Sequence, residues 1–211
     1  MKKLILLALL LTTVCVSAQY YEAKLLMTDG TIKEGFARLP SNQLLDSKVE
    51  YRTTRKGETQ KFEDDEVHQI LITSEEKNQF LFARTNVVHL YKSFGKEIEK
   101  EKKNKHWMLL YYSHPKIKEF FLSQRYKINR KGKMIAVTGA NSFWSTVYFL
   151  FQRPEEEKAY VVSGKGFPNG MVRKAMAIYF KDTPTFAARI ESKEFKKANV
   201  SEVAKAYTEH E

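Results

Sequence analysis

Glycines, histidines and acidic residues supply the groups in this chain that could do chemistry. The segment 163–170 (SGKGFPNG) is glycine-rich and lies between an expected strand and an expected helix, where phosphate groups often bind. Its spacing fits neither the P-loop order nor the dinucleotide-binding order G-x-G-x-x-G. The segment therefore predicts a surface connection that Pro168 interrupts, and the sequence predicts no nucleotide cofactor.

The histidines raise the question of a metal site. No two of them are three or four residues apart, and the chain has no H-E-x-x-H motif. We expect exposed or hydrogen-bonded histidines and no metal, although a site assembled from distant strands stays open. The residues concerned are His68, His89, His106, His114 and His210.

Acidic residues cluster at 64–66 and at 155–157. A two-carboxylate hydrolase needs its carboxyl groups roughly 5–10 Å apart across a cleft, whereas adjacent acids in a turn point apart. The chain also has no G-x-S-x-G nucleophile motif. We therefore expect two solvated turns and favour a protein without catalytic residues, although a scattered triad would leave no signature in the sequence.

Positive charge is the one functional feature with a preferred location. The formal net charge is +11, and residues 116–133 contain many basic residues against the single acid Glu119. We expect Arg125 and Lys127 to share the outer face of a strand that leads into a basic turn, so that the resulting ridge attracts anionic partners. The alternative is that these side chains only keep the protein soluble. The candidate residues are Lys116, Lys118, Arg125, Lys127, Arg130, Lys131 and Lys133.

The first 18 residues have the pattern of a signal peptide. Lys2 and Lys3 precede an apolar run, and small residues lie before the bond between Ala18 and Gln19. The run is shorter than the roughly 20 residues of a membrane-spanning helix. We predict cleavage between Ala18 and Gln19; the alternatives are lipidation of Cys15 and an uncleaved anchor. Cleavage would remove the only cysteine, which excludes disulfides and thiolate sites.

A cleaved signal peptide predicts an exported protein, periplasmic or extracellular, that is free or rests on the envelope. No later segment is long and apolar enough to predict a transmembrane span in the mature chain. After export, nucleic acid is not the expected partner. Lipopolysaccharide, an anionic lipid or an acidic protein fits a basic chain better.

Residues 19–75 predict a small β-barrel-like subdomain. Alternating apolar residues predict strands at 21–28, 31–39, 48–53, 59–63 and 68–73, with a helical turn at 64–67. Asp29-Gly30 predicts a type I′ hairpin turn, and Gly35 predicts a bend or bulge in the return strand. Five short strands of this kind are typical of an SH3-like or Sm-like barrel.

Residues 76–211 predict an antiparallel β-sheet with C-terminal helices packed on it. The pattern indicates strands at 80–84, 87–91, 106–113, 119–128, 134–138, 143–151 and 160–162. The charged stretch 92–105 predicts a solvated helix or flexible loop. Helical spacing covers 171–180, Thr183-Pro184 starts a second helix, and Asn199 caps a third. The fold class is therefore α+β and β-rich.

Three segments resemble exported proteins of Bacteroidetes and flavobacteria whose function is uncharacterised. They are VSAQ at the signal end, KLLMTDGTIKEGFARL with DDEVHQI further on, and AIYFKDTPTFAARIESKEF followed by EVAKAY. The resemblance implies localisation and architecture, and it carries no catalytic residue. We therefore expect a non-enzymatic binding or scaffold module of the cell envelope. The alternative is a periplasmic hydrolase or small-ligand-binding protein with a pocket between the sheet and the C-terminal helices.

Overall fold

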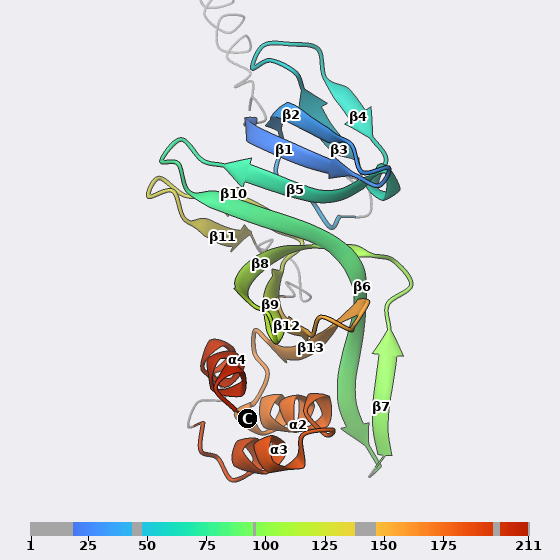
Figure 1. The fold of residues 1–211 in the computed structure, drawn as a ribbon, viewed down its shortest axis with the longest axis vertical. Coiled ribbons are helices and arrows are strands. Elements are labelled where there is room, and N and C mark those ends of the chain that lie inside the picture. The colour runs from blue at the N-terminus through green and yellow to red at the C-terminus, as the bar shows by residue number, and fades with distance from the viewer. Residues whose placement is uncertain (1–18, 44–47, 95, 138–146, 196–198, 211) are drawn as a thin grey trace, which may run out of the picture.

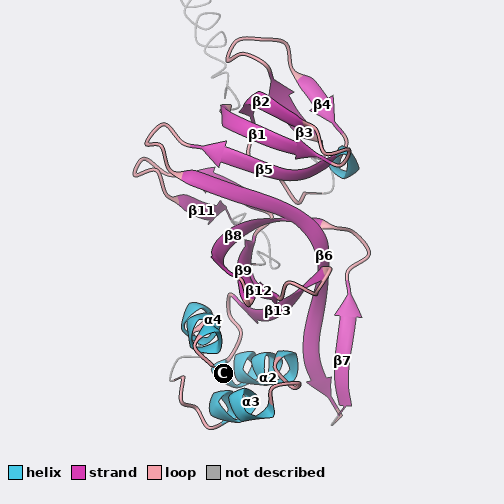
Figure 2. Ribbon diagram, viewed as in Figure 1, coloured by secondary structure: helices cyan, strands magenta, loops and turns pink. Residues whose placement is uncertain are grey.

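The computed structural model describes residues 19–43, 48–94, 96–137, 147–195 and 199–210. The predicted signal peptide, with Ala18 and Cys15, lies outside these ranges. The fold is α+β and β-rich, as the sequence predicts. Figure 1 shows the N-terminal strands at one end, a barrel in the middle and the C-terminal helices at the other end, and Figure 2 separates the same layers by secondary structure.

Five strands and a short 3-10 helix form the N-terminal unit, in the order β5-β1-β2-β3-β4. Alternation along β1 and β5 directs Leu25, Ile70 and Ile72 into a common core, where all three are fully buried. This confirms the predicted barrel-like subdomain. The outer edge of β5 pairs with β6, so the unit continues into the rest of the sheet. The elements are β1 Tyr21–Met27, β2 Ile32–Ala37, β3 Val49–Arg52, β4 Gln60–Phe62, η1 Asp64–Glu66 and β5 Val67–Thr73.

The turn between β1 and β2 differs from the expected type. Gly30 has a φ of 86°, but Asp29 is not among the described residues with positive φ. The Gly30 amide donates to the Met27 carbonyl at 3.1 Å, and the Met27 amide donates to the Thr31 carbonyl at 2.8 Å. This is a three-residue loop with a bulge glycine, in place of a type I′ turn. The Asp29 carboxylate accepts from the Thr31 amide and hydroxyl, which fixes the loop.

Gly30→Val is expected to lower the free energy of unfolding by about 1–2 kcal/mol, because a β-branched residue resists the left-handed backbone. No neighbouring atom would touch the added Cβ, so the whole effect is conformational. Gly30→Asn is the matched control and should stay close to the native stability, since asparagine tolerates positive φ. Urea titration of both variants measures the difference; equal losses would contradict this account of the turn.

Gly35 has a different role from the predicted bulge. The β1–β2 register runs through it without a shift, with Ala23 opposite Gly35. A Cβ at this position would lie 2.3 Å from the Arg52 carbonyl oxygen and 2.6 Å from the Tyr51 hydroxyl. Glycine is therefore required by the close approach of β3. The Tyr51 hydroxyl uses this space to donate to the Glu34 carbonyl at 2.6 Å.

One long strand, β6 (Gln79–Ser93), replaces the two strands expected at 80–84 and 87–91. Ala83 lies between β5 and β8, whereas Val88 lies between β13 and β7. The strand β7 (Lys96–Glu101) lies inside the stretch expected to be a solvated helix or loop. That prediction was wrong, because pairing with β6 satisfies the backbone while the charged side chains stay exposed. The strand β6 therefore joins the N-terminal unit to the rest of the sheet.

Residues 82–89 of β6 take part in a closed five-stranded barrel, β6-β8-β9-β12-β13. The closing pair is parallel and joins residues 158–161 of β13 to residues 86–89 of β6. Met108, Leu150 and Val161 belong to the buried cluster that fills the barrel. The remaining strands are β8 His106–His114, β9 Ile117–Leu122, β12 Tyr148–Gln152 and β13 Lys158–Gly164. The first residues of the strand expected at 143–151 lie outside the described ranges.

The strand expected at 119–128 is divided in two. Its first part belongs to β9, and its second part is β10 (Arg125–Ile128). Among the described strands, β10 pairs only with β11 (Met134–Val137), in a separate hairpin. Asn42 lies beside the segment between β9 and β10. Its side-chain amide donates to the Trp107 and Ser123 carbonyls, both at 2.8 Å. These contacts hold the chain as it leaves the barrel.

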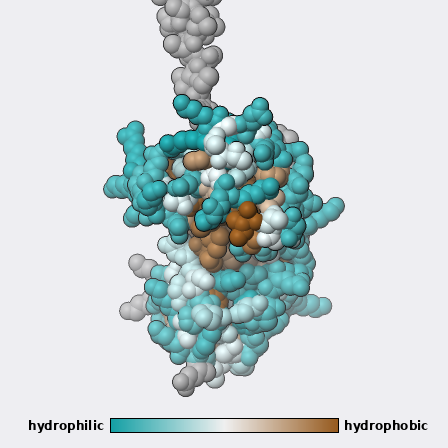
Figure 3. Space-filling model, turned by 45° about the horizontal axis from the view of Figure 1, so that its top comes forward, coloured by the Kyte–Doolittle hydropathy of each residue, from teal (hydrophilic) through white to brown (hydrophobic). Residues whose placement is uncertain are grey.

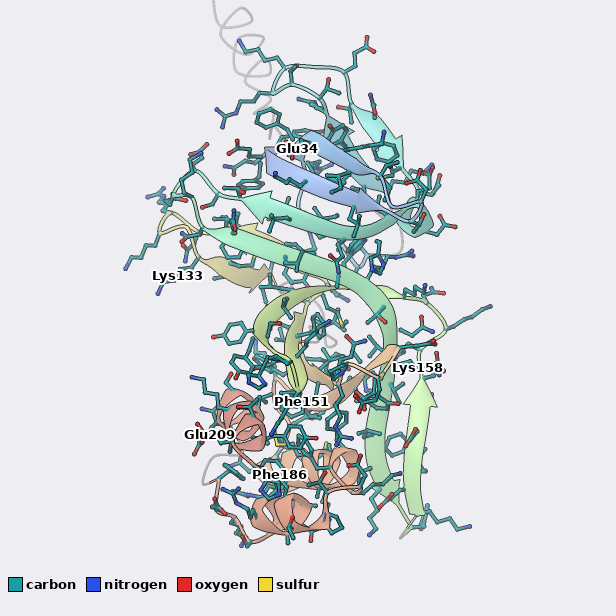
Figure 4. The ribbon with its side chains drawn as sticks, viewed as in Figure 1. Glu34, Lys133, Phe151, Lys158, Phe186 and Glu209 are labelled. Carbon is teal, nitrogen blue, oxygen red and sulfur yellow. The ribbon has the colours of Figure 1, made fainter. Side chains whose placement is uncertain are left out.

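Three helices cover the outer face of the barrel: α2 Asn169–Tyr179, α3 Pro184–Glu191 and α4 Val200–Thr208. Pro184 occupies the first turn of α3, and the Asn199 side chain accepts from the Ser201 and Glu202 amides, as the sequence predicts. Phe151 of β12 and Phe186 of α3 lie in the core between the two layers (Figure 4). No helix in the described part of the chain is long and apolar enough to cross a membrane.

Candidate functional site

The β10–β11 hairpin places five of the predicted basic residues on one rigid support. Tyr126 and Ile128 are buried in the N-terminal core, so the alternating Arg125 and Lys127 face solvent. The Tyr126 hydroxyl accepts from the Ser123 amide at 3.1 Å and lies 2.9 Å from the Trp107 carbonyl oxygen, to which it donates. We call Arg125, Lys127, Arg130, Lys131 and Lys133 the basic hairpin.

Asn129 fixes the turn of the basic hairpin. Its side-chain oxygen accepts from the backbone amides of Lys131 and Lys133 at 2.9 and 3.0 Å. Gly132 follows with a φ of 68°, and its amide donates to the Asn129 carbonyl. The three cations of the turn are thus presented by an ordered backbone, which reduces the entropy lost on binding.

All five side chains of the basic hairpin are exposed, and Lys133 points away from the body of the molecule in Figure 4. None of the five forms an ion pair with another residue of the described ranges. One acid lies near, because the Glu76 carboxylate rests against Gly132. The local charge is still strongly positive, and the cations are available to an external anion.

The remaining two residues of the predicted ridge lie elsewhere. Lys116 and Lys118 are exposed at the start of β9, whereas Arg125 follows its end. A strand of this length spans roughly 17 Å, so the ridge divides into two surfaces. Lys116 donates to the His210 carbonyl at 2.9 Å and therefore has a structural contact with the C-terminal segment.

Apolar side chains accompany the charges of the basic hairpin. Ile135 is 41% exposed and lies directly opposite Lys127, while Val137 lies opposite Arg125. Figure 3 shows one face of the whole molecule, which is largely hydrophilic with hydrophobic colouring near its centre. The outer face of the basic hairpin thus combines cations with apolar groups, as a surface for an anionic amphiphile requires.

A second candidate site is a cavity of about 160 Å³ at the end of the barrel where β9 ends and β8 and β12 begin. Val87 and Leu122 supply apolar walls, and His89, His106 and Tyr148 supply polar ones. The rings of His89 and Tyr148 meet edge to face at 5.0 Å between centroids. No local sequence pattern indicates this pair of histidines, because His89 lies on β6 and His106 on β8.

The surroundings of the cavity favour the neutral form of both histidines. Burial, together with the charges of Lys102, His106 and Lys100, lowers the pKa of His89 to about 4. Burial also lowers the pKa of His106, together with Lys102 and Arg84. No carboxylate is among the described residues that line the cavity. The site is therefore rich in donors and poor in negative charge.

The other histidines lie apart from one another. His68 is exposed on β5, His114 lies at the end of β8, and His210 packs on Phe186. Within the described ranges, no three histidines, cysteines or acids gather closely enough to hold a metal ion. The glycine-rich segment 163–170 forms the connection from β13 to α2, where Gly164 packs against Tyr148 and Phe167.

One of the acids expected in a solvated turn is partly buried. Glu156 accepts from the Tyr179 hydroxyl at 2.6 Å and from the Arg153 amide at 2.7 Å. Burial raises the pKa of its carboxyl group. The prediction of a solvated turn was wrong for Glu156, because α2 packs over it, whereas Glu155 and Glu157 are exposed.

Apolar side chains fill the space between the barrel and the helices, where the alternative hypothesis placed a pocket. A shallow cavity of about 160 Å³ lies at the rim of this layer. Arg153, Glu156 and Asp182 line it, and the described lining residues include no histidine. The rim therefore offers carboxylates without the histidine that a general base or a triad of the expected kind would use.

Comparison with family models, with curated proteins and with solved structures found no match to this chain.

Proposed function

We propose that this protein is an exported, non-enzymatic binding module of the cell envelope that holds an anionic amphiphile on the basic hairpin. The single observation that supports the proposal is the set of five exposed cations without ion-pair partners in the described ranges, on a hairpin that Tyr126 and Asn129 fix in place. Lipopolysaccharide and anionic phospholipid share the chemistry required, because both place phosphate groups beside acyl chains. An acidic protein is the second class of partner.

Electrostatic attraction sets the expected strength of this interaction. A lysine or arginine near an anionic lipid surface contributes roughly 1 kcal/mol at physiological salt. The exposed Ile135 side chain, opposite Lys127, adds apolar area beside the cations. Five cations are therefore sufficient for reversible binding. The affinity should fall as salt shortens the range of the attraction from about 10 Å at 0.1 M to about 3 Å at 1 M.

Reversing two charges of the basic hairpin is expected to abolish most of the binding. Arg130→Glu combined with Lys131→Glu should lower the affinity for phosphatidylglycerol vesicles at least tenfold, because two attractive charges become repulsive. Vesicle co-sedimentation measures the change, with phosphatidylcholine vesicles as the uncharged reference.

The matched control is Lys56→Glu combined with Lys165→Glu, which changes the net charge equally at two exposed positions outside the hairpin. It should bind vesicles nearly as well as the native protein. Equal losses in both variants would show that only net charge matters, and no binding to anionic vesicles by the native protein would defeat the lipid proposal. Binding of an acidic protein that neither type of vesicle displaces would favour the alternative of a protein partner.

A further inference from the structure

Two buried polar atoms in the cavity at the end of the barrel lack hydrogen-bond partners in the described structure. They are Nε2 of His89 and Oγ of Ser123, and the whole Ser123 residue is only 1% exposed. Buried polar groups in folded proteins nearly always have a partner, so two such atoms in one cavity indicate that something polar occupies it. Both residues are among those that line the cavity.

The shape and charge of the cavity define the class of occupant. Lys102 and His106 bring donors to the same cavity, and no described lining residue carries a negative charge. Val87 and Leu122, both buried, form an apolar part beside these groups. A volume of about 160 Å³ corresponds to roughly five water molecules, which leaves room for a small organic ion.

We propose that this cavity binds a short-chain carboxylate, with its charged end at Lys102, His106 and Ser123 and its alkyl end against Val87 and Leu122. The carboxylate would accept hydrogen bonds from Oγ of Ser123 and from the imidazoles, which supplies the missing partners. This site is independent of the basic hairpin and shares no residue with it.

Binding of an anion should change the titration of the histidines. Burial is the main cause of the lowered pKa of His89, and Lys102, His106 and Lys100 add to it. A carboxylate placed among these groups would offset their charge and raise that pKa from its value of about 4. A neutral ligand of the same shape would leave the charge balance unchanged, so the two can be distinguished.

The experiment is a titration of the protein with butyrate at pH 7, followed by the NMR signals of the imidazole carbon-bound protons, with butyramide as the neutral analogue. Butyrate should shift the His89 and His106 signals in a saturable manner, and butyramide should not. The pH at which the His89 signal titrates should rise when butyrate is present.

Two variants make the proposal specific. Lys102→Gln should weaken butyrate binding about tenfold, because it removes one hydrogen bond to a charged group. Its control, Lys103→Gln, changes the next residue, which is exposed and outside the cavity, and should bind normally. Ser123→Ala should weaken binding while keeping or raising the melting temperature, since its hydroxyl has no protein partner in the described ranges.

A cavity that holds only water would give no saturable shift with butyrate, and this result would overturn the proposal. Equal shifts with butyrate and butyramide would overturn the assignment to carboxylates. None of these changes should alter vesicle binding, so a failure here leaves the proposal for the basic hairpin unaffected, and the reverse also holds.

Discussion

Replacing Arg153 by alanine is expected to lower the free energy of unfolding by about 3 kcal/mol. The residue is only 7% exposed and lies where α2 meets the barrel. Its guanidinium donates to both carboxylate oxygens of Asp182, one at 2.8 Å, and to the Tyr179 carbonyl at 3.3 Å. It also lies over the rings of Tyr179, Phe180 and Tyr207 at 4.9–5.5 Å. Alanine would remove all these contacts and leave a void. The expected loss is below that of a fully buried pair, since the Asp182 side chain is 58% exposed.

Arg189→Ala is the matched control for this prediction. Arg189 makes the same kinds of contact, with a bidentate pair to Glu194 and two aromatic neighbours, but its side chain is 38% exposed. Exposed pairs contribute about 0–1 kcal/mol, so this variant should lose much less stability. Urea denaturation of both variants gives the comparison. A loss for Arg153→Ala as small as that for Arg189→Ala would mean that the buried contacts contribute little to joining the layers.

Glu119→Gln is expected to stabilise the protein at pH 8 by up to about 3 kcal/mol and to have little effect at pH 5. Glu119 has no exposed surface, and its one described hydrogen bond is from the Ser201 hydroxyl at 3.0 Å. Burial raises the pKa of its carboxyl group from 4.5 to about 7, and the Ser201 hydrogen bond and Lys205 offset this only in part. Each pKa unit between the folded and unfolded states corresponds to about 1.4 kcal/mol.

The sign follows from proton binding. Between pH 4.5 and about 7, the folded state retains the Glu119 proton while the unfolded state has lost it. Stability therefore falls as pH rises through this window and changes no further above it. His89 and His106 act in the opposite direction, because their folded pKa values are lowered. The difference between the native protein and Glu119→Gln isolates the carboxyl group, and a difference independent of pH from 5 to 8 would contradict the prediction.

Local patterns were sufficient for the elements whose determinants lie within a few residues. The strands of the N-terminal unit follow from alternation around Leu25 and Ile70, and the last helix begins at the asparagine cap that the sequence contains. Asp29-Gly30 marked the first turn correctly but not its type, since an Asp-Gly pair suits both a type I′ turn and a bulge loop.

Features that depend on distant residues could not be predicted in this way. The barrel closes by pairing Asn86 with Lys158, and no local pattern connects these positions. The charged strand β7 was missed because its pairing with β6 outweighs its composition. The clustering of charge in the sequence indicated the residues of the basic hairpin. It also included Lys116, which the structure places at the other end of β9. The His89 and His106 cavity depends on β6 and β8 meeting, so sequence spacing carried no signal for it.

The parallel closing pair also constrains the order in which the chain can acquire its native state. Residues 86–89 of β6 need a partner that is made about seventy residues later, and contacts of such long range slow folding. Until residues 158–161 arrive, a nascent chain has an open strand edge there, which is a template for pairing with another copy. Truncation anywhere before β13 would leave that edge permanently open. Pairing with β13 covers this edge, so we expect chains that end before residue 158 to self-associate.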